Sequence, residues 1–226
     1  MKELPIKKLI EYNSYSDRRK STMLGKLQQV ESVFSNSKDA RDYWHRSLTA
    51  IRKSFKFNDY QFLVDRIRFI SDDLSKTTVR KTKIMYERNI QILNNFLEFN
   101  YTRLMPPHKV RFISQTTEVS IISVNGIQLK IHGDDLFSYE INSVKHIGAV
   151  WFVASKDGYR DDELAIFVDA LYRMLDNNLS DDYIINTDYC CVVDAMKKNI
   201  LTYSQIMDKP TKSKLDLIVS EISKTL

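Results

Sequence analysis

The first hundred residues repeat apolar side chains at intervals of three and four positions, with charged side chains between them. This spacing is typical of a helix that buries one face. It predicts helices over residues 17–34, 38–55, 58–74 and 75–99, although Gly25 weakens the first of them. The buried stripes of the last three are Trp44, Leu48, Ile51 and Phe55; Leu63, Ile67 and Ile70; and Met85, Ile92, Phe96 and Phe99.

Two consecutive prolines, Pro106 and Pro107, end the helical pattern. Neither can continue a helix, and each favours an extended conformation in the residue before it. We therefore place a boundary between a helical basic region at 1–107 and an α/β domain at 108–226. Beyond the prolines the pattern alternates or is rich in β-branched residues, which predicts strands at 111–115, 118–124, 127–132 and 136–141.

Four further features complete the predicted fold. Asn125-Gly126 predicts a hairpin turn between the second and third of these strands. Residues 146–155, HIGAVWFVAS, are apolar almost throughout, as in a central strand that is covered on both faces. Residues 160–178 and 212–226 predict amphipathic helices, and 189–193 predict another buried strand followed by a short return strand. The sequence thus predicts an α+β fold, with a helical N-terminal region followed by a mixed β-sheet flanked by helices.

The composition narrows the class of protein. Hydrophobic residues make up 43% and charged residues 28% of the 226 positions, which is ordinary for a globular protein. No apolar run approaches the roughly 20 residues of a membrane span, so we expect no membrane partner. The two cysteines, Cys190 and Cys191, are neighbours that point to opposite faces of a strand and are poorly placed to pair. We therefore expect a reducing, cytoplasmic location.

Charge is divided unevenly along the chain. Residues 1–110 hold 22 Lys/Arg and 12 Asp/Glu, a net charge of +10, and residues 111–226 hold 12 and 17, a net charge of −5. This division has two interpretations: the basic half binds a polyanion such as nucleic acid, or the two halves of the chain attract each other. Two basic clusters are candidate phosphate contacts, and a solvated helix face is the competing interpretation. The clusters are Arg52, Lys53 and Lys56, and Arg80, Lys81 and Lys83.

The usual catalytic motifs are absent from the sequence. It has no GxGxxG, GxxxxGK[ST], HExxH, CxxC or GxSxG pattern, so nucleotide loops, zinc sites and nucleophile elbows have no support. The best remaining candidate is the stretch 132–156, HGDDLFSYEINSVKHIGAVWFVASK. Two adjacent aspartates lie there in a Gly-containing turn, and a lysine follows an apolar strand.

The order of strands, helix and strand pair over residues 110–200 resembles the core of the PD-(D/E)xK nuclease superfamily. The resemblance implies that Asp134 or Asp135 is the lone acid and that 154–156, Ala-Ser-Lys, is the Glu-x-Lys stretch. Ala154 departs from that pattern, because it replaces a metal-binding acid. Glu163, on the next helix, or Glu140 would then supply the carboxylate. The resemblance implies Asp135 and Glu163 as Mg²⁺ or Mn²⁺ ligands, and Asp135, Lys156 and Glu163 as catalytic residues.

The whole chain also resembles a loosely defined set of uncharacterised, defence-associated bacterial proteins, through residues 89–93, 133–135, 148–156 and 191–194.

The stretches HGDD and SKDG also have a purely structural interpretation, because Asp and Gly are common in turns that have no catalytic role. Asp194 at the end of a buried strand is a further candidate, and it could equally cap a turn. Two functions follow as hypotheses: a nucleic-acid-binding protein with a degenerate nuclease core, and a non-catalytic subunit that binds a protein partner.

Overall fold

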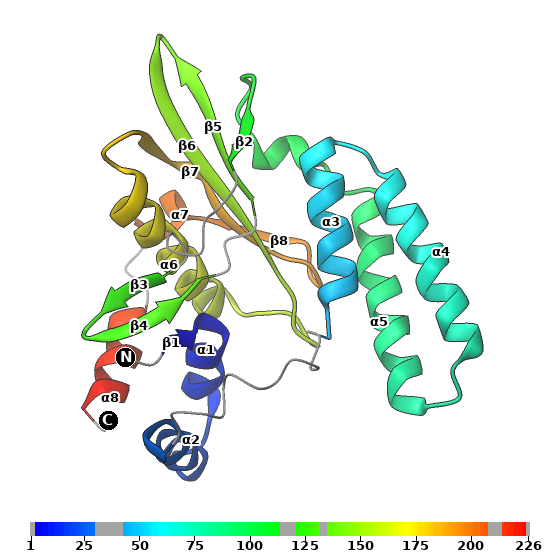
Figure 1. Cartoon of the computed structure of the whole chain (residues 1–226), viewed down its shortest axis with the longest axis horizontal. Coiled ribbons are helices and arrows are strands. Elements are labelled where there is room, and N and C mark those ends of the chain that lie inside the picture. Colours follow the sequence, from blue (N-terminus) through cyan, green and yellow to red (C-terminus); the bar gives the residue numbers. More distant parts are fainter. Residues whose placement is uncertain (1–2, 30–42, 114–120, 132–134, 208–213, 225–226) are drawn as a thin grey trace.

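A five-stranded mixed sheet, in the order β2-β5-β6-β7-β8, organises the chain (Figure 1). The computed structural model describes residues 3–29, 43–113, 121–131, 135–207 and 214–224. Within this sheet, as far as the structure describes it, β6 and β7 are the one parallel pair, and helix α6 (Asp161–Leu179) connects them, because parallel strands need a long crossover. The strands are β2 (Arg111–Ile113), β5 (Asp135–Ile141), β6 (Val144–Val153), β7 (Ile184–Asp194) and β8 (Asn199–Thr202).

The central strand β6 contributes to two hydrophobic cores. Ala149 and Trp151 point to the side of α6, whereas Val150 and Phe152 point to the opposite side, as the two-residue period of a strand requires. Residues 147–154 are all buried. The prediction of a central strand covered on both faces is therefore confirmed.

On one side of the sheet, α6 shares a core with the β3–β4 hairpin and with elements from both ends of the chain. Among them, β1 runs parallel to β4, so the N-terminus joins a second, three-stranded sheet in the order β1-β4-β3. The predicted turn at Asn125-Gly126 connects β3 to β4, and both residues have positive φ. These elements are β1 (Glu3–Pro5), α1 (Ile6–Ser14), α2 (Asp17–Gln29), β3 (Ile121–Val124), β4 (Ile127–Lys130), α7 (Tyr203–Met207) and α8 (Leu215–Ser223).

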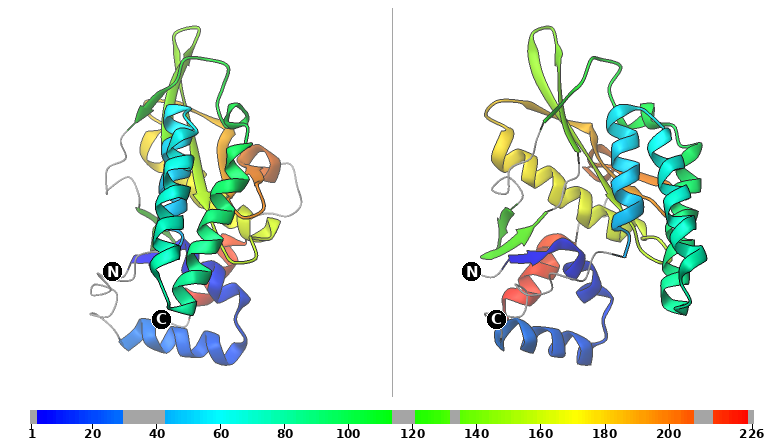
Figure 2. Two further views of the ribbon diagram at one scale, coloured as in Figure 1. Left: turned by 90° about the vertical axis from the view of Figure 1, so that its right-hand side faces the viewer. Right: turned by 45° about the vertical axis from the view of Figure 1, so that its right-hand side comes forward.

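The other face is covered by three helices, α3 (His45–Phe57), α4 (Gln61–Lys76) and α5 (Arg80–Leu97), which we call the α3–α5 bundle (Figure 2). A short 3₁₀ helix, η1 (Tyr101–Leu104), follows α5. The stripes predicted for these helices are buried only in part: Phe55, Leu63 and Phe96 are each 0% exposed, whereas Leu48, Ile67 and Met85 are half-buried. Phe55 and Phe96 contact Phe152 of β6, with ring centres 5.6 and 6.1 Å apart. The bundle therefore shares one core with the sheet.

The α+β class is confirmed, with helices concentrated in the N-terminal half and the sheets built largely from the C-terminal half. The division into regions at residue 107 stays a prediction. Residues 3–14 lie on the α6 side of the sheet, and the bundle lies on the other side (Figure 1). None of the helices among the described residues is both long and apolar enough to cross a bilayer.

Candidate functional site

Asp135, the first residue of β5, faces the α3–α5 bundle and meets Arg52 of α3. The Nε atom of Arg52 lies 3.4 Å from Oδ2 of Asp135. The Asp135 side chain is only 8% exposed, whereas that of Arg52 is 41% exposed. Burial raises the pKa of Asp135, and the positive charges of Arg52 and Lys56 oppose this rise only in part. The carboxylate thus joins the sheet to α3.

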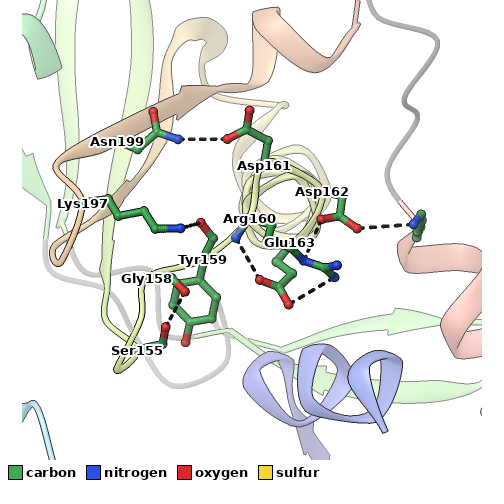
Figure 3. A network of polar contacts seen from close by, with 10 residues as sticks. Ser155, Gly158, Tyr159, Arg160, Asp161, Asp162, Glu163, Lys197 and Asn199 are labelled. Atoms are coloured by element: carbon green, nitrogen blue, oxygen red, sulfur yellow. Dashed lines mark hydrogen bonds and ion pairs between the residues drawn. The ribbon is translucent and has the colours of Figure 1, made fainter. Parts of the chain in front are cut away.

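Glu163 lies in the first turn of α6 and caps the N-terminal end of the helix (Figure 3). It accepts a hydrogen bond from the backbone N–H of Arg160 at 2.9 Å, and the Arg160 guanidinium lies 3.4 Å from its other oxygen. The carboxylate therefore satisfies a backbone donor that the helix leaves unpaired. Lys156 is an exposed residue of the turn between β6 and α6.

The structure does not bring Asp135 and Glu163 together. Asp135 lies on the bundle face of the sheet, and α6, which carries Glu163, covers the opposite face. No group of three or more His, Cys, Asp or Glu side chains that could hold a metal ion occurs within the described residues. The catalytic and metal-binding roles of Asp135, Lys156 and Glu163 stay predictions, and Asp134 lies outside the described residues.

The remaining acids of the sequence hypotheses have other neighbours. Ala154, where the nuclease resemblance would require an acid, is 3% exposed in the bundle-side core. Glu140 is exposed near the β5–β6 turn and lies opposite Lys145 in the strand register. Asp194 is fully buried and accepts hydrogen bonds from the backbone N–H groups of Tyr159, at 2.7 Å, and Met196, at 2.9 Å. Asp194 thereby holds the loop between β6 and α6 in place.

The two basic clusters lie at opposite ends of the bundle. Arg52, Lys53 and Lys56 occupy the last turns of α3, and Arg80, Lys81 and Lys83 begin α5. Because α4, with 16 residues, runs between the two turns, the clusters are about 24 Å apart. All except Arg52 are exposed. Lys56 also lies against Phe112, with its Nζ atom 5.6 Å from the ring centre.

A groove runs between α3 and α4, and we call it the α3–α4 groove. Its volume is about 290 Å³, and it is lined by Ala50, Lys53, Phe62, Asp65, Arg66 and Phe69. The Phe69 side chain is 55% exposed, although it is large and apolar. The guanidinium carbons of Arg46 and Arg66 lie 5.8 and 5.7 Å from the centre of its ring. Two guanidinium groups thus lie over the partly exposed ring of Phe69, in cation–π contact with it.

Contacts between α3 and α4 lie near both ends of the groove. At one end Arg46 of α3 forms an ion pair with Asp73 of α4. At the other end the rings of Phe57 and Phe62 lie 5.5 Å apart, and Phe57 is 61% exposed. These contacts fix the separation of the helices, so that the groove is part of the folded structure.

The groove was not predicted from the sequence, although it leaves a signal there. The core stripe of α4 is Leu63, Ile67 and Ile70, and Phe62 and Phe69 fall outside it. Two phenylalanines seven positions apart share one helix face, which indicates a second apolar line beside the core stripe.

Comparison with known proteins finds no matching family model, curated protein or solved structure.

Proposed function

We propose that the protein binds nucleic acid through the α3–α5 bundle, with exposed cations at both ends contacting phosphates. The observation that carries the proposal is the charge of the bundle. Residues 45–97 hold eleven Lys/Arg and five Asp/Glu, a net charge of +6. This exceeds the +5 of the whole chain, so the excess positive charge is concentrated on one face of the sheet.

Most of these cations are open to solvent. Lys53, Arg80, Lys81 and Lys83 are exposed and form no ion pair with any described residue. Arg52 differs from them, because it forms an ion pair with Asp135. When exposed cations of this kind bind phosphates, the counterions condensed on the nucleic acid are released. Such contacts position the strand without reading its sequence.

A second candidate function is binding of a protein partner. The exposed Phe69, which lines the groove, and the exposed Phe57 near it favour this function, because large apolar side chains at a groove are typical of surfaces that accept a partner helix. The two functions differ in their dependence on salt. Phosphate contacts weaken steeply as salt rises, whereas binding driven by apolar contacts does not.

The test measures binding of a fluorescently labelled oligonucleotide of about 12 nucleotides at roughly 50 and 200 mM salt. The variant is the triple substitution Arg80→Gln, Lys81→Gln and Lys83→Gln. Lys224→Gln is the control, since Lys224 is an exposed lysine at the end of α8, on the opposite side of the sheet from the bundle. We expect wild-type affinity to fall with salt. The triple variant should bind more weakly, with a salt slope shallower by roughly 0.7–0.9 for each phosphate that is no longer neutralised.

Two results would contradict the proposal. One is the absence of any binding at low salt, for single strands and duplexes alike. The other is equal loss of affinity in the triple variant and in the Lys224→Gln control. The second result would show that the bundle has no special part in the interaction.

A further inference from the structure

We infer that the α3–α4 groove accepts an unstacked nucleic-acid base, which makes a single strand the preferred ligand. This inference rests on the proposed function and adds the class of nucleic acid to it. It starts from Phe69, a large apolar residue of α4 that is 55% exposed in the groove. An aromatic ring of this kind is a stacking platform for any base.

The charges around the groove match this ligand. Lys53 is an exposed groove residue of α3, and Arg66 lies on α4 across from it. The two cations can contact phosphates on either side of a base that lies on Phe69. Arg46, whose guanidinium is also near the ring, is already paired with Asp73. The arrangement combines an aromatic platform with flanking cations, as single-strand-binding surfaces do.

Asp65 indicates which part of the nucleotide enters the groove. Its carboxylate lines the groove and accepts a hydrogen bond from Nε2 of Gln61 at 2.7 Å. A phosphate placed here would meet a like charge, which is unfavourable. The edge of a base carries N–H donors, which a carboxylate accepts. The base therefore belongs inside the groove and the phosphates outside it.

The size of the groove and the structure of a duplex both indicate that the ligand is one base of a single strand. A volume of about 290 Å³ lies at the lower end of small-ligand pockets, which suits a single base. In a duplex the faces of the bases are stacked on one another and cannot reach Phe69. A duplex can still contact the cations through its phosphates. The groove thus adds affinity only for single strands.

The experiment compares a single strand with the duplex of the same sequence, at one salt concentration. The variants are Phe69→Ala, which removes the ring, and Phe69→Trp, which keeps a stacking surface. Leu217→Ala is the control, because Leu217 on α8 is 72% exposed and far from the groove. We expect wild type to prefer the single strand. Phe69→Ala should weaken single-strand binding by roughly five- to 150-fold, equivalent to the about 1–3 kcal/mol of one stacked base.

Phe69→Trp should restore single-strand affinity, and Phe69→Ala should leave duplex affinity unchanged. If wild type binds single strand and duplex equally and Phe69→Ala alters neither, the inference is wrong while the proposed function stands. If neither nucleic acid binds, the proposed function fails and the inference fails with it. Equal losses in Phe69→Ala and Leu217→Ala would also overturn the inference, because stacking would then not explain the effect.

Discussion

The Nε atom of Arg52 lies 3.4 Å from Oδ2 of Asp135, which joins the last turns of α3 to the first residue of β5. The contact joins one residue from each of two candidate sites predicted from the sequence. Arg52 belongs to a candidate phosphate-binding cluster, and Asp135 to a candidate metal site. A buried carboxylate with a raised pKa indicates either a functional site or a structural ion pair. Here the neighbouring guanidinium favours the structural role.

Arg52→Gln should destabilise the protein more at neutral than at acidic pH. The folded-state pKa of Asp135 is raised, so its proton is bound more tightly in the folded than in the unfolded chain. Stability from this group is therefore fully present below the unfolded pKa and is lost as pH rises through the folded pKa. Loss of Arg52 removes the charge that most strongly opposes this rise, so ionisation of the buried Asp135 at neutral pH becomes more costly, by about 1–3 kcal/mol.

Urea unfolding at pH 7 and near pH 4 measures this effect. Lys53→Gln is the control, since Lys53 is the exposed neighbour of Arg52. Asp135→Asn should remove the pH-dependent component, because asparagine does not ionise. A loss of equal size at both pH values in Arg52→Gln would show that the charge of Asp135 is not the cause.

Gly158→Ala should destabilise the loop that precedes α6. Gly158 has a φ of +71°, and a Cβ atom there would lie 2.6 Å from Oδ2 of Asp194. Asp194 is fully buried and holds two backbone N–H groups, so it cannot move without breaking these hydrogen bonds. We expect the free energy of unfolding to fall by about 1–3 kcal/mol, measured by urea denaturation.

Gly25→Ala is the matched control for this substitution. Gly25 lies inside α2, and a Cβ atom there meets nothing within 4 Å. Alanine is favoured over glycine in a helix, so stability should rise by roughly 0.5–1 kcal/mol. If both substitutions change stability in the same direction, the contact with Asp194 does not explain the result for Gly158.

Asp65 should give the groove a preference for bases with an amino group. The exocyclic amine of cytosine donates to a carboxylate, whereas thymine presents an acceptor at the same position. Competition between short cytosine and thymine strands should favour cytosine, and Asp65→Ala should abolish the difference. The expected size is about 1–3 kcal/mol. Asp72→Ala, at an exposed position of α4 outside the groove, should keep the preference.

The local elements of the fold could be predicted from the sequence, and its long-range pairings could not. Residues 146–155 predicted a doubly covered strand because burial on both faces leaves almost no polar position in the pattern. In contrast, β1 has three residues, too few to show any period, and its partner β4 lies more than a hundred positions away. Its pairing depends on tertiary contacts alone.

The same distinction applies to the candidate site. The cluster Arg52, Lys53 and Lys56 is obvious as a run of charge, but neighbouring residues on a helix point about 100° apart. Arg52 consequently faces the sheet and Lys53 faces the groove, which only the packing of α3 decides. The exposure of Phe69 could not be predicted from the sequence for a similar reason. A phenylalanine in a helix suggests the core until the neighbouring helix is placed.

The alternation of side chains along β6 also determines how cooperatively the protein unfolds. The chain has two tryptophans, and each lies in a different core: Trp151 of β6 on the α6 side and Trp44 on the bundle side. Because every second residue of β6 belongs to the opposite core, neither core can lose its packing while the other keeps an intact central strand. The fluorescence of the two indoles should therefore change together, in one cooperative transition that couples both halves of the protein.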